Sequence, residues 1–324
     1  MEILPTEDIK KRVLVTGGAG FIGSKLVQAL LNRRVKVRIL DCQYGPFTRT
    51  EDPNLEFVGI GDDELHAGMV DKNIVNRAVR DVDIVYHLAI NWDGHTWKHQ
   101  TPLSDLFEAN IRGTLNLLEA ARAQRIKHFL FSSSCAVYGS QEAQRVDEET
   151  VCKPELWKGD PGPAYGVLKL AAEKLCLMYH YRHGLPTTAF RIEFVFDENN
   201  ALPSREIIDN LRGERIIEVV EGEGYASVHV DEVVEAFLLA TLNKKAYGQI
   251  FNLSNPSTFI TYRDLYRLLI QKKKSKSHLR LISSKEYGGR AVESIDKIRT
   301  VLGWEPSKTQ EDLKQAILQS IKSL

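Results

Sequence analysis

The stretch VLVTGGAGFIG, from Val13 to Gly23, decides the fold of this chain. A short β-branched run leads into a glycine-rich turn, and apolar residues at helical spacing follow as far as Asn32. Glycines let the turn tighten and let its backbone approach a pyrophosphate, which sits on free N–H groups at the positive end of the helix. The stretch therefore predicts a phosphate-binding turn, with Gly17, Gly20 and Gly23 in the spacing that such turns use. The alternative is a glycine turn with a structural role only.

Short apolar strands alternate with helical segments over the first 196 residues. We expect further strands at 35–40, 55–58, 82–88, 126–131 and 187–196, and further helices at 70–79, 105–123 and 165–181. This alternation implies βαβ crossovers and a parallel sheet with helices on both faces. The predicted fold class is an α/β, Rossmann-type doubly wound parallel sheet.

The alternation loosens after residue 196. We expect helices at 205–212, 231–241, 262–270, 295–302 and 310–321, and strands at 215–220 and 249–253. We therefore divide the chain into a nucleotide-binding domain over 1–196 and a smaller mixed substrate-binding lobe over 197–324. Residues from about 225 to 255 contribute a strand and a helix that can return to the first domain.

The composition narrows the function classes. Basic and acidic residues both number 43, so no overall positive field indicates a nucleic acid or a membrane surface as partner. No apolar stretch approaches the roughly 18 residues of a membrane span, and the polar start of the chain does not resemble a signal peptide. The four cysteines are scattered and the nine histidines lack metal-ligand spacing, which fits a cytoplasmic protein without a metal.

A carboxylate follows the second expected strand. Asp41 lies about 20 residues beyond the glycine turn, where an acid can accept hydrogen bonds from the ribose hydroxyls of an adenosine nucleotide. The same charge repels a 2′-phosphate. We therefore expect NAD as the cofactor, in preference to NADP.

Two further motifs carry chemistry. Tyr165 and Lys169 are four residues apart on an expected helix, so they share a face, and an ammonium beside a phenol lowers the phenol pKa. The motif SSSCAVYG, from Ser132 to Gly139, follows a buried strand at the edge where ligands collect in open α/β sheets. We expect Ser134 to hydrogen-bond the reacting oxygen and Ser132 to satisfy local backbone groups.

Taken together, these motifs resemble those of the extended short-chain dehydrogenase/reductase family, and most closely its NAD-dependent sugar epimerase/dehydratase type. The resemblance extends to the tail of the chain, so it covers nearly the whole length. The further segments that carry it are HLA at 87–89, NIRGTLNLLEA at 110–120, VHVDEVVEAFLLA at 228–240, IFNLSNPSTFITYRDL at 250–265 and LGWEPS at 302–307.

The resemblance implies that Ser134, Tyr165 and Lys169 are the catalytic residues. It implies further cofactor contacts from Phe21, Ile22, Asp41, Asp62, Leu88, Ala89 and Asn110. It also implies a homodimer that pairs the helices at 105–123 and 165–181. In the implied reaction Tyr165 removes a hydroxyl proton, Ser134 orients the oxygen, and Lys169 lowers the pKa of the tyrosine.

The chain also departs from the family pattern. Family dehydratases and decarboxylases carry an acid in the two positions after the catalytic hydroxyl, where this chain has Cys135 and Ala136, so we expect neither reaction. Phe194 replaces an asparagine that nucleotide-sugar enzymes carry, and no arginine precedes Val228 to grip a diphosphate. Four arginines could substitute for it, namely Arg205, Arg212, Arg215 and Arg290.

Cys135, Trp92, His95 and Phe194 are the candidate substrate contacts, although the stretch with the tryptophan and histidine could be an ordinary covering loop. The first hypothesis is an NAD-dependent epimerase that acts on a sugar, most simply a nucleotide sugar. The second is an NAD-dependent dehydrogenase or ketoreductase on a hydroxyl or carbonyl substrate without a nucleotide. The third is a NAD-binding protein with a structural or regulatory role.

Overall fold

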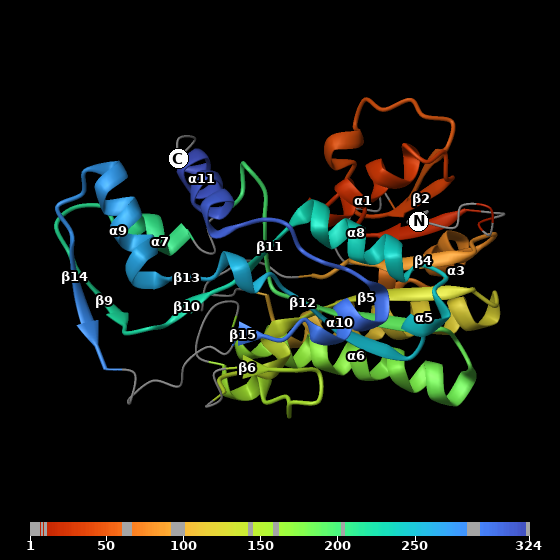
Figure 1. Ribbon diagram of the computed structural model, residues 1–324. Helices are drawn as coiled ribbons and strands as arrows, with labels where there is room; N and C mark the ends of the chain where they lie inside the picture. The colour runs from red at the N-terminus through yellow and green to blue at the C-terminus, as the bar shows by residue number, and fades with distance from the viewer. Residues whose placement is uncertain are drawn as a thin grey trace.

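The computed structural model describes residues 7, 9, 12–59, 67–91, 101–141, 145–157, 162–201, 205–283 and 292–321. Within these residues a seven-stranded parallel sheet has the order β12-β7-β5-β4-β1-β2-β3 (Figure 1). Its strands are β1 (Val13–Thr16), β2 (Val37–Leu40), β3 (Leu55–Val58), β4 (Ile84–His87), β5 (His128–Ser134), β7 (Thr187–Ile192) and β12 (Gln249–Leu253). The order reverses between β1 and β4, as in doubly wound sheets, and it confirms the predicted fold class.

Helices cover both faces of the sheet (Figure 1). One face packs against α1 (Phe21–Leu31), α8 (Val230–Ala240) and α10 (Asp296–Leu302), and the other against α3 (Lys72–Val79), α5 (Gly113–Ala123) and α6 (Pro163–His183). Successive strand side chains point to opposite faces, so Val13 and Val15 enter the first core while Leu14 enters the second. Burying each such side chain contributes about 1.5–3 kcal/mol, which explains why most positions in these strands are apolar.

Two predicted helices are interrupted. The expected helix at 70–79 is split into α2 (Ala67–Val70) and α3, because the Asp71 side chain accepts hydrogen bonds from Asn73 N and Ile74 N and so caps a new helix. The expected helix at 105–123 consists of α4 (Leu103–Phe107), a π-helical turn (Glu108–Arg112) and α5. Such single π turns are frequent at functional sites.

Two strand boundaries differ from the prediction. The expected strand at 126–131 was too short, because β5 continues through the three serines, which pair with β7 as far as Ser134 opposite Ile192. The expected strand at 187–196 breaks at Glu193, because β8 (Phe194–Phe196) leaves the sheet to pair with β11 (Ser227–His229). Glu193 thus lies where the chain leaves the carboxyl edge of the sheet.

A lobe with its own apolar core projects beyond this edge (Figure 1). It contains α7 (Arg205–Asp209), β9 (Ile216–Val220), β10 (Gly224–Tyr225), β13 (Ile260–Thr261), α9 (Tyr262–Lys273), β14 (His278–Ile282) and α11 (Gln310–Ser320). A further strand pair joins β6 (Arg145–Val146) to β15 (Val292–Glu293). The strand β12 lies in the main sheet, and the division of the chain at residue 196 stays a prediction.

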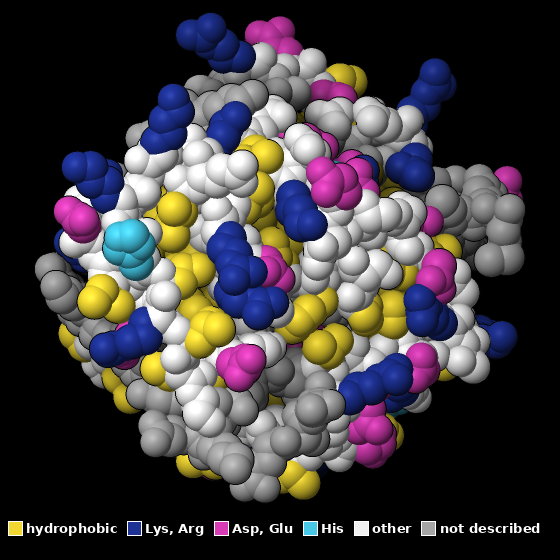
Figure 2. Space-filling view, turned by 60° about the vertical axis from the view of Figure 1, so that its left-hand side comes forward, with side chains coloured by type: hydrophobic (Ala, Val, Ile, Leu, Met, Phe, Trp, Pro, Cys, Tyr) yellow, Lys and Arg dark blue, Asp and Glu magenta, His cyan; other side chains and the backbone are white. Residues whose placement is uncertain are grey.

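Short 3-10 turns connect several elements, at Gly45–Phe47, Cys135–Tyr138, Pro154–Leu156, Lys244–Ala246 and Pro256–Thr258. On the face that Figure 2 shows, lysine and arginine side chains are interspersed with acidic and apolar ones. Among the described residues, no helix combines the length and the apolar character that a membrane crossing requires.

One buried carboxylate fastens the tail of the chain to α8. Glu232 Oε1 accepts hydrogen bonds from Ser307 N at 2.6 Å and Lys308 N at 2.8 Å, and its Oε2 accepts one from His229 N at 3.1 Å. The Trp304 indole donates to the Glu232 carbonyl at 3.0 Å. A single side chain therefore caps the helix and holds the segment that leads into α11.

We expect Glu232→Ala to lower the free energy of unfolding by about 2 kcal/mol, because buried N–H groups lose their acceptor. Glu235→Ala is the matched control, since Glu235 is half-buried on the same helix. Chemical denaturation of both variants measures the effect. Equal loss in the two variants would contradict this role for Glu232.

Candidate active site

The glycine turn lies against the end of β4. Gly17 has φ +68°, and a Cβ added to it would lie 2.7 Å from Ala89 N. A Cβ on Gly23 would lie 2.1 Å from the Gly17 carbonyl oxygen. Any side chain at these positions would therefore push the turn away from β4 or from α1. Steric clash thus explains why both positions are glycine.

The first turn of α1 has the geometry of an anion site. Its N-cap is Gly20, which offers no side chain to the first N–H groups of the helix, and Phe21 and Ile22 follow as the first helical residues. These N–H groups have no partner within a helix and carry its positive dipole end. The residues present therefore fit the pyrophosphate of a dinucleotide.

Asp41 lies beside this turn, as predicted. One of its carboxylate oxygens accepts a hydrogen bond from Ala19 N at 2.9 Å, and the other accepts one from Cys42 N at 2.8 Å. The acid is therefore fixed next to the glycines, where it can meet ribose hydroxyls and would repel a 2′-phosphate. Asp62, the other predicted acid, lies outside the described residues.

Buried polar side chains link the end of β4 to β1 and α5. The Thr16 hydroxyl lies 2.7 Å from His87 Nδ1 and accepts from Ala89 N at 3.2 Å. The other imidazole nitrogen of His87 lies 2.8 Å from the Thr114 hydroxyl. Burial, and then the charge of Lys169, lower the pKa of His87 to about 3, so the ring is neutral. All three residues lie in sequence motifs, His87 in HLA, Thr16 in VLVTGGAGFIG and Thr114 in NIRGTLNLLEA, but no sequence pattern indicated this role for any of them.

Asn110 holds the segment that follows β4. Its side-chain oxygen accepts a hydrogen bond from Asn91 N at 2.8 Å, and its side-chain nitrogen donates one to the Asn91 carbonyl at 2.9 Å. Asn110 lies in the π-helical turn, which explains how its side chain reaches this backbone. Leu88 and Ala89 lie between His87 and Asn91, so the structure brings three predicted cofactor contacts to the same edge as the glycine turn.

The three predicted catalytic residues come together at the end of β5. The side chains of Ser134 and Tyr165 are near neighbours, and Lys169 Nζ lies 5.8 Å from the centre of the Tyr165 ring. Lys169 Nζ also donates to the Ser132 carbonyl at 2.7 Å. Close approach of α6 makes this possible, because a Cβ on Gly166 would lie 2.5 Å from the Ala136 carbonyl.

Burial dominates the titration of this group. It raises the pKa of Tyr165 to about 12, against the hydrogen bond from Ser134, which works to lower it. Burial also lowers the pKa of Lys169 to about 7. Burial therefore outweighs the neighbouring side chains, and the prediction that the lysine and a positively charged nicotinamide together lower the pKa of the tyrosine stays a prediction. A phenolate here needs the further positive charge of an oxidised nicotinamide.

The candidate substrate contacts are spread more widely. Cys135 is buried, and its thiol donates to the Arg191 carbonyl at 3.1 Å. Phe194 begins β8 and packs edge-on against Tyr225, with ring centroids 5.8 Å apart. Trp92 and His95 lie outside the described residues. The structure thus places Cys135 directly beside Ser134 and turns Phe194 toward the lobe.

Two acids that sequence reasoning did not assign lie near Cys135. The Cys135 thiol and carboxylate oxygens of Glu193 and Glu293 all lie within 4.8 Å of one another, and all three residues are buried. The only signal in the sequence was an acid within the apolar strand expected at 187–196, in the segment RIEF. Glu293 comes from β15, so only the folded chain brings it here.

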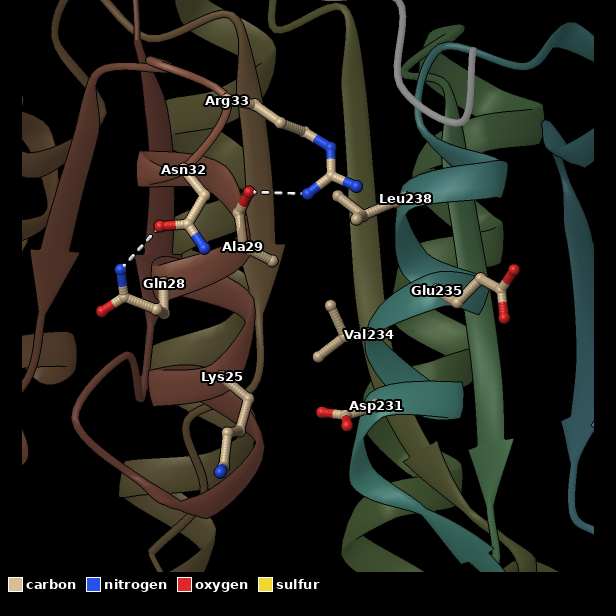
Figure 3. A pocket seen from close by; sticks show the side chains of 9 residues that line it. All are labelled: Lys25, Gln28, Ala29, Asn32, Arg33, Asp231, Val234, Glu235 and Leu238. Carbon is tan, nitrogen blue, oxygen red and sulfur yellow. Dashed lines mark hydrogen bonds between the residues drawn. The ribbon is translucent and has the colours of Figure 1, made fainter. Parts of the chain in front are cut away.

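An open groove of about 420 Å³ runs between α1 and α8, away from these residues (Figure 3). Lys25 and Arg33 lie on its α1 side, while Asp231 and Glu235 lie on its α8 side. None of the predicted site residues that the structure describes lines it. The candidate active site is therefore the carboxyl edge of the sheet, because the glycine turn and the Ser134–Tyr165 pair meet there.

The sequence profile of the NAD dependent epimerase/dehydratase family matches residues 13–254. The chain belongs to this family. NAD is accordingly the cofactor of the nucleotide site, which the glycine turn and Asp41 fit.

The relatives include more than one activity. The chain is 29% identical to UDP-glucose 4-epimerase of Lactobacillus helveticus, over 93% of this chain and 94% of that one. It is 30% identical to UDP-N-acetyl-alpha-D-glucosaminuronate decarboxylase of Bacillus cytotoxicus, over 76% of each chain. It is also 30% identical to an uncharacterized protein, y4nG of Sinorhizobium fredii, over 85% of this chain but only 63% of that one.

Solved structures agree on the fold. The structure of UDP-glucuronic acid 4-epimerase from Bacillus cereus, in complex with UDP-glucuronic acid and NAD, superposes with a TM-score of 0.75 at 24% identity. The match covers 96% of this chain and 99% of that one. At this identity the likeness supports the architecture of both the sheet and the lobe, and no more.

Proposed function

We propose that this chain is an NAD-dependent epimerase that acts on a nucleotide sugar. The observation that carries the proposal is the grouping of Ser134, Tyr165 and Lys169 at the edge that holds the glycine turn. Membership of the epimerase/dehydratase family and the epimerase from Lactobacillus helveticus support it.

Bound NAD supplies a hydride acceptor that can return the hydride. Tyr165, as phenolate, takes the proton of a sugar hydroxyl while the hydride leaves the same carbon, which becomes a ketone. Ser134 donates a hydrogen bond to that oxygen, and Lys169, in its protonated form, adds to the positive charge that stabilises the phenolate. Return of the proton from Tyr165 to the oxygen, with hydride on the opposite face of the carbon, completes the epimerisation without net redox change.

A dehydrogenase or ketoreductase is the second candidate, and the surroundings of the lobe favour it. The position before Val228 is a serine, and Glu198 lies 3.5 Å from His229 Nε2. Arg212, which could have gripped a diphosphate, pairs with Asp209 at 3.2 Å. Arg290 and the side chain of Arg205 lie outside the described residues. A substrate with less negative charge would suit these surroundings.

A sugar panel separates the two candidates. The purified chain with NAD is incubated with UDP-, GDP- and dTDP-sugars, and products are identified by proton NMR. We expect one sugar to give its epimer with no lasting change in nicotinamide absorbance. Stoichiometric NADH formation with an alcohol would favour the dehydrogenase, and no isomer from any sugar would overturn the proposal.

The same sugar panel also tests whether the chain catalyses decarboxylation. Neither Cys135 nor Ala136 is an acid, and on that ground we propose epimerisation rather than loss of carbon dioxide. A decarboxylase is nevertheless among the relatives. Release of carbon dioxide from a UDP-uronic acid would overturn this part of the proposal.

We further propose a cytoplasmic homodimer. Apolar side chains are exposed on the helices that the resemblance pairs: Leu103 (61%) and Phe107 (48%) on α4, and Val167 (44%) and Met178 (41%) on α6. Exposed apolar surface on adjacent helices supports a protein interface. Sedimentation should give twice the 36.7 kDa of one chain.

A further inference from the structure

A buried ion pair lies directly behind the catalytic residues. Arg191 of β7 is 1% exposed, and Glu173 of α6 is fully buried. The guanidinium donates to both carboxylate oxygens, with Nη2 2.8 Å from Oε1 and Nε 3.0 Å from Oε2. Glu173 follows Lys169 by one helical turn, so the pair ties the catalytic face of α6 to the sheet.

A third residue joins this pair to the strand that carries Ser134. The Ser133 hydroxyl donates to Glu173 Oε2 at 2.8 Å. Its two chain neighbours both belong to the site, because the Ser132 carbonyl accepts a hydrogen bond from Lys169 and the Ser134 side chain neighbours Tyr165. Glu173 is therefore held by β5 and β7 at once, from the helix that carries the tyrosine and the lysine.

Stability alone does not explain such a pair. Moving two charges out of water costs several kcal/mol per ion, and well-packed apolar residues often stabilise a core as well or better. Burial works to raise the pKa of Glu173, yet the hydrogen bonds and charge of Arg191 hold it below its usual range. The carboxylate is therefore kept ionised, and its directional bonds define one position for the helix.

We propose that Ser133, Glu173 and Arg191 form a positioning unit for Tyr165 and Lys169. The unit fixes the location of α6 along the sheet, at which the Tyr165 hydroxyl meets Ser134 and Lys169 reaches the Ser132 carbonyl. A displacement of about 1 Å at reacting groups can cost a hundredfold in rate, so small contacts behind them matter. The inference rests on the proposed catalytic roles of Ser134, Tyr165 and Lys169.

The same arginine offers a matched control on its other side. Arg191 Nη1 donates to the Tyr138 hydroxyl at 3.0 Å, and that hydroxyl donates to Asn252 Oδ1 at 2.6 Å. Tyr138→Phe removes a buried hydrogen bond from Arg191 but keeps the ring beneath the guanidinium, which lies 4.8 Å from the ring centre. The bonds from Ser133 and Arg191 to Glu173 are left intact.

The experiment compares Ser133→Ala with Tyr138→Phe. Each removes one neutral buried hydroxyl, which makes one side-chain hydrogen bond at Ser133 and two at Tyr138, so the loss in Tm should be no larger for Ser133→Ala than for Tyr138→Phe. We expect Ser133→Ala alone to lower kcat about tenfold, with KM for the sugar and the Kd for NAD within twofold of the parent. It should also shift the limb of the pH–rate profile that belongs to Tyr165. Equal effects on kcat in the two variants, or no effect in Ser133→Ala, would overturn the inference.

A second measurement needs no substrate. Fluorotyrosine is incorporated throughout the chain, and the ¹⁹F resonance of Tyr165 is assigned by its loss in Tyr165→Phe. Ser133→Ala should move this resonance, whereas Tyr138→Phe should leave it in place. A Tyr165 resonance unchanged in Ser133→Ala would overturn the inference even if no sugar of the panel reacts. An inactive parent chain in which Ser133→Ala still shifts the resonance would overturn only the proposed function.

Discussion

Tyr165→Phe should lower kcat for the proposed epimerisation by about a thousandfold. The change removes one hydroxyl, and positioned acid–base groups contribute about 10²–10⁴ in rate. Ser134 would then face a ring edge and could still orient the substrate oxygen, but no group at that place could take its proton. Steady-state kinetics with the active sugar of the panel measures the loss.

The same variant should bind NAD with unchanged affinity. Tyr181→Phe is the matched control, because Tyr181 lies on the same helix and is 75% exposed. We expect the control to keep full activity. A Tyr165→Phe variant that also keeps full activity would contradict the catalytic role and would favour a structural or regulatory NAD-binding protein.

Gly17→Ala should weaken NAD binding at least about a hundredfold. The new methyl would lie 2.7 Å from Ala89 N and 2.8 Å from Ala89 Cα, both of which are backbone atoms that cannot rotate away. The turn must therefore move from the end of β4, and its N–H groups move with it. Isothermal calorimetry with NAD measures the loss.

Gly184→Ala is the control that separates the effect of the steric clash from the effect of backbone strain. Gly184 ends α6 with the same φ of +68°, but no described residue lies within 4 Å of an added Cβ. This variant should lose about 1 kcal/mol of stability from the left-handed conformation and bind NAD normally. A Gly17→Ala variant with parental NAD affinity would show that the close approach to Ala89 does not position the cofactor.

Local sequence patterns predicted the sheet and most of its helices, because the formation of each strand and helix depends mainly on residues close together in the chain. A glycine turn between a β-branched run and a helix with periodic apolar residues is typical of a phosphate-binding turn. The strand β12 was predicted from a short apolar run alone. The predicted strand boundaries were wrong where pairing with another strand sets them. The serines of β5 are polar, yet they are strand residues because β7 pairs with them. The break at Glu193 follows from the pairing of β8 with β11.

Sequence by itself indicated the doubly wound sheet and the nucleotide turn with Asp41, because these depend on patterns within short segments of the chain. It pointed to Ser134, Tyr165 and Lys169 through their motifs and the family resemblance, and their catalytic roles stay proposals. Only the tertiary structure decided which buried side chains pack behind the catalytic candidates. Ser133 and Glu173 are 40 residues apart, and Glu173 and Arg191 are 18 apart, and no local pattern links such positions. They meet because parallel strands with crossover helices bring distant segments to one edge, where burial makes each unpaired charge costly.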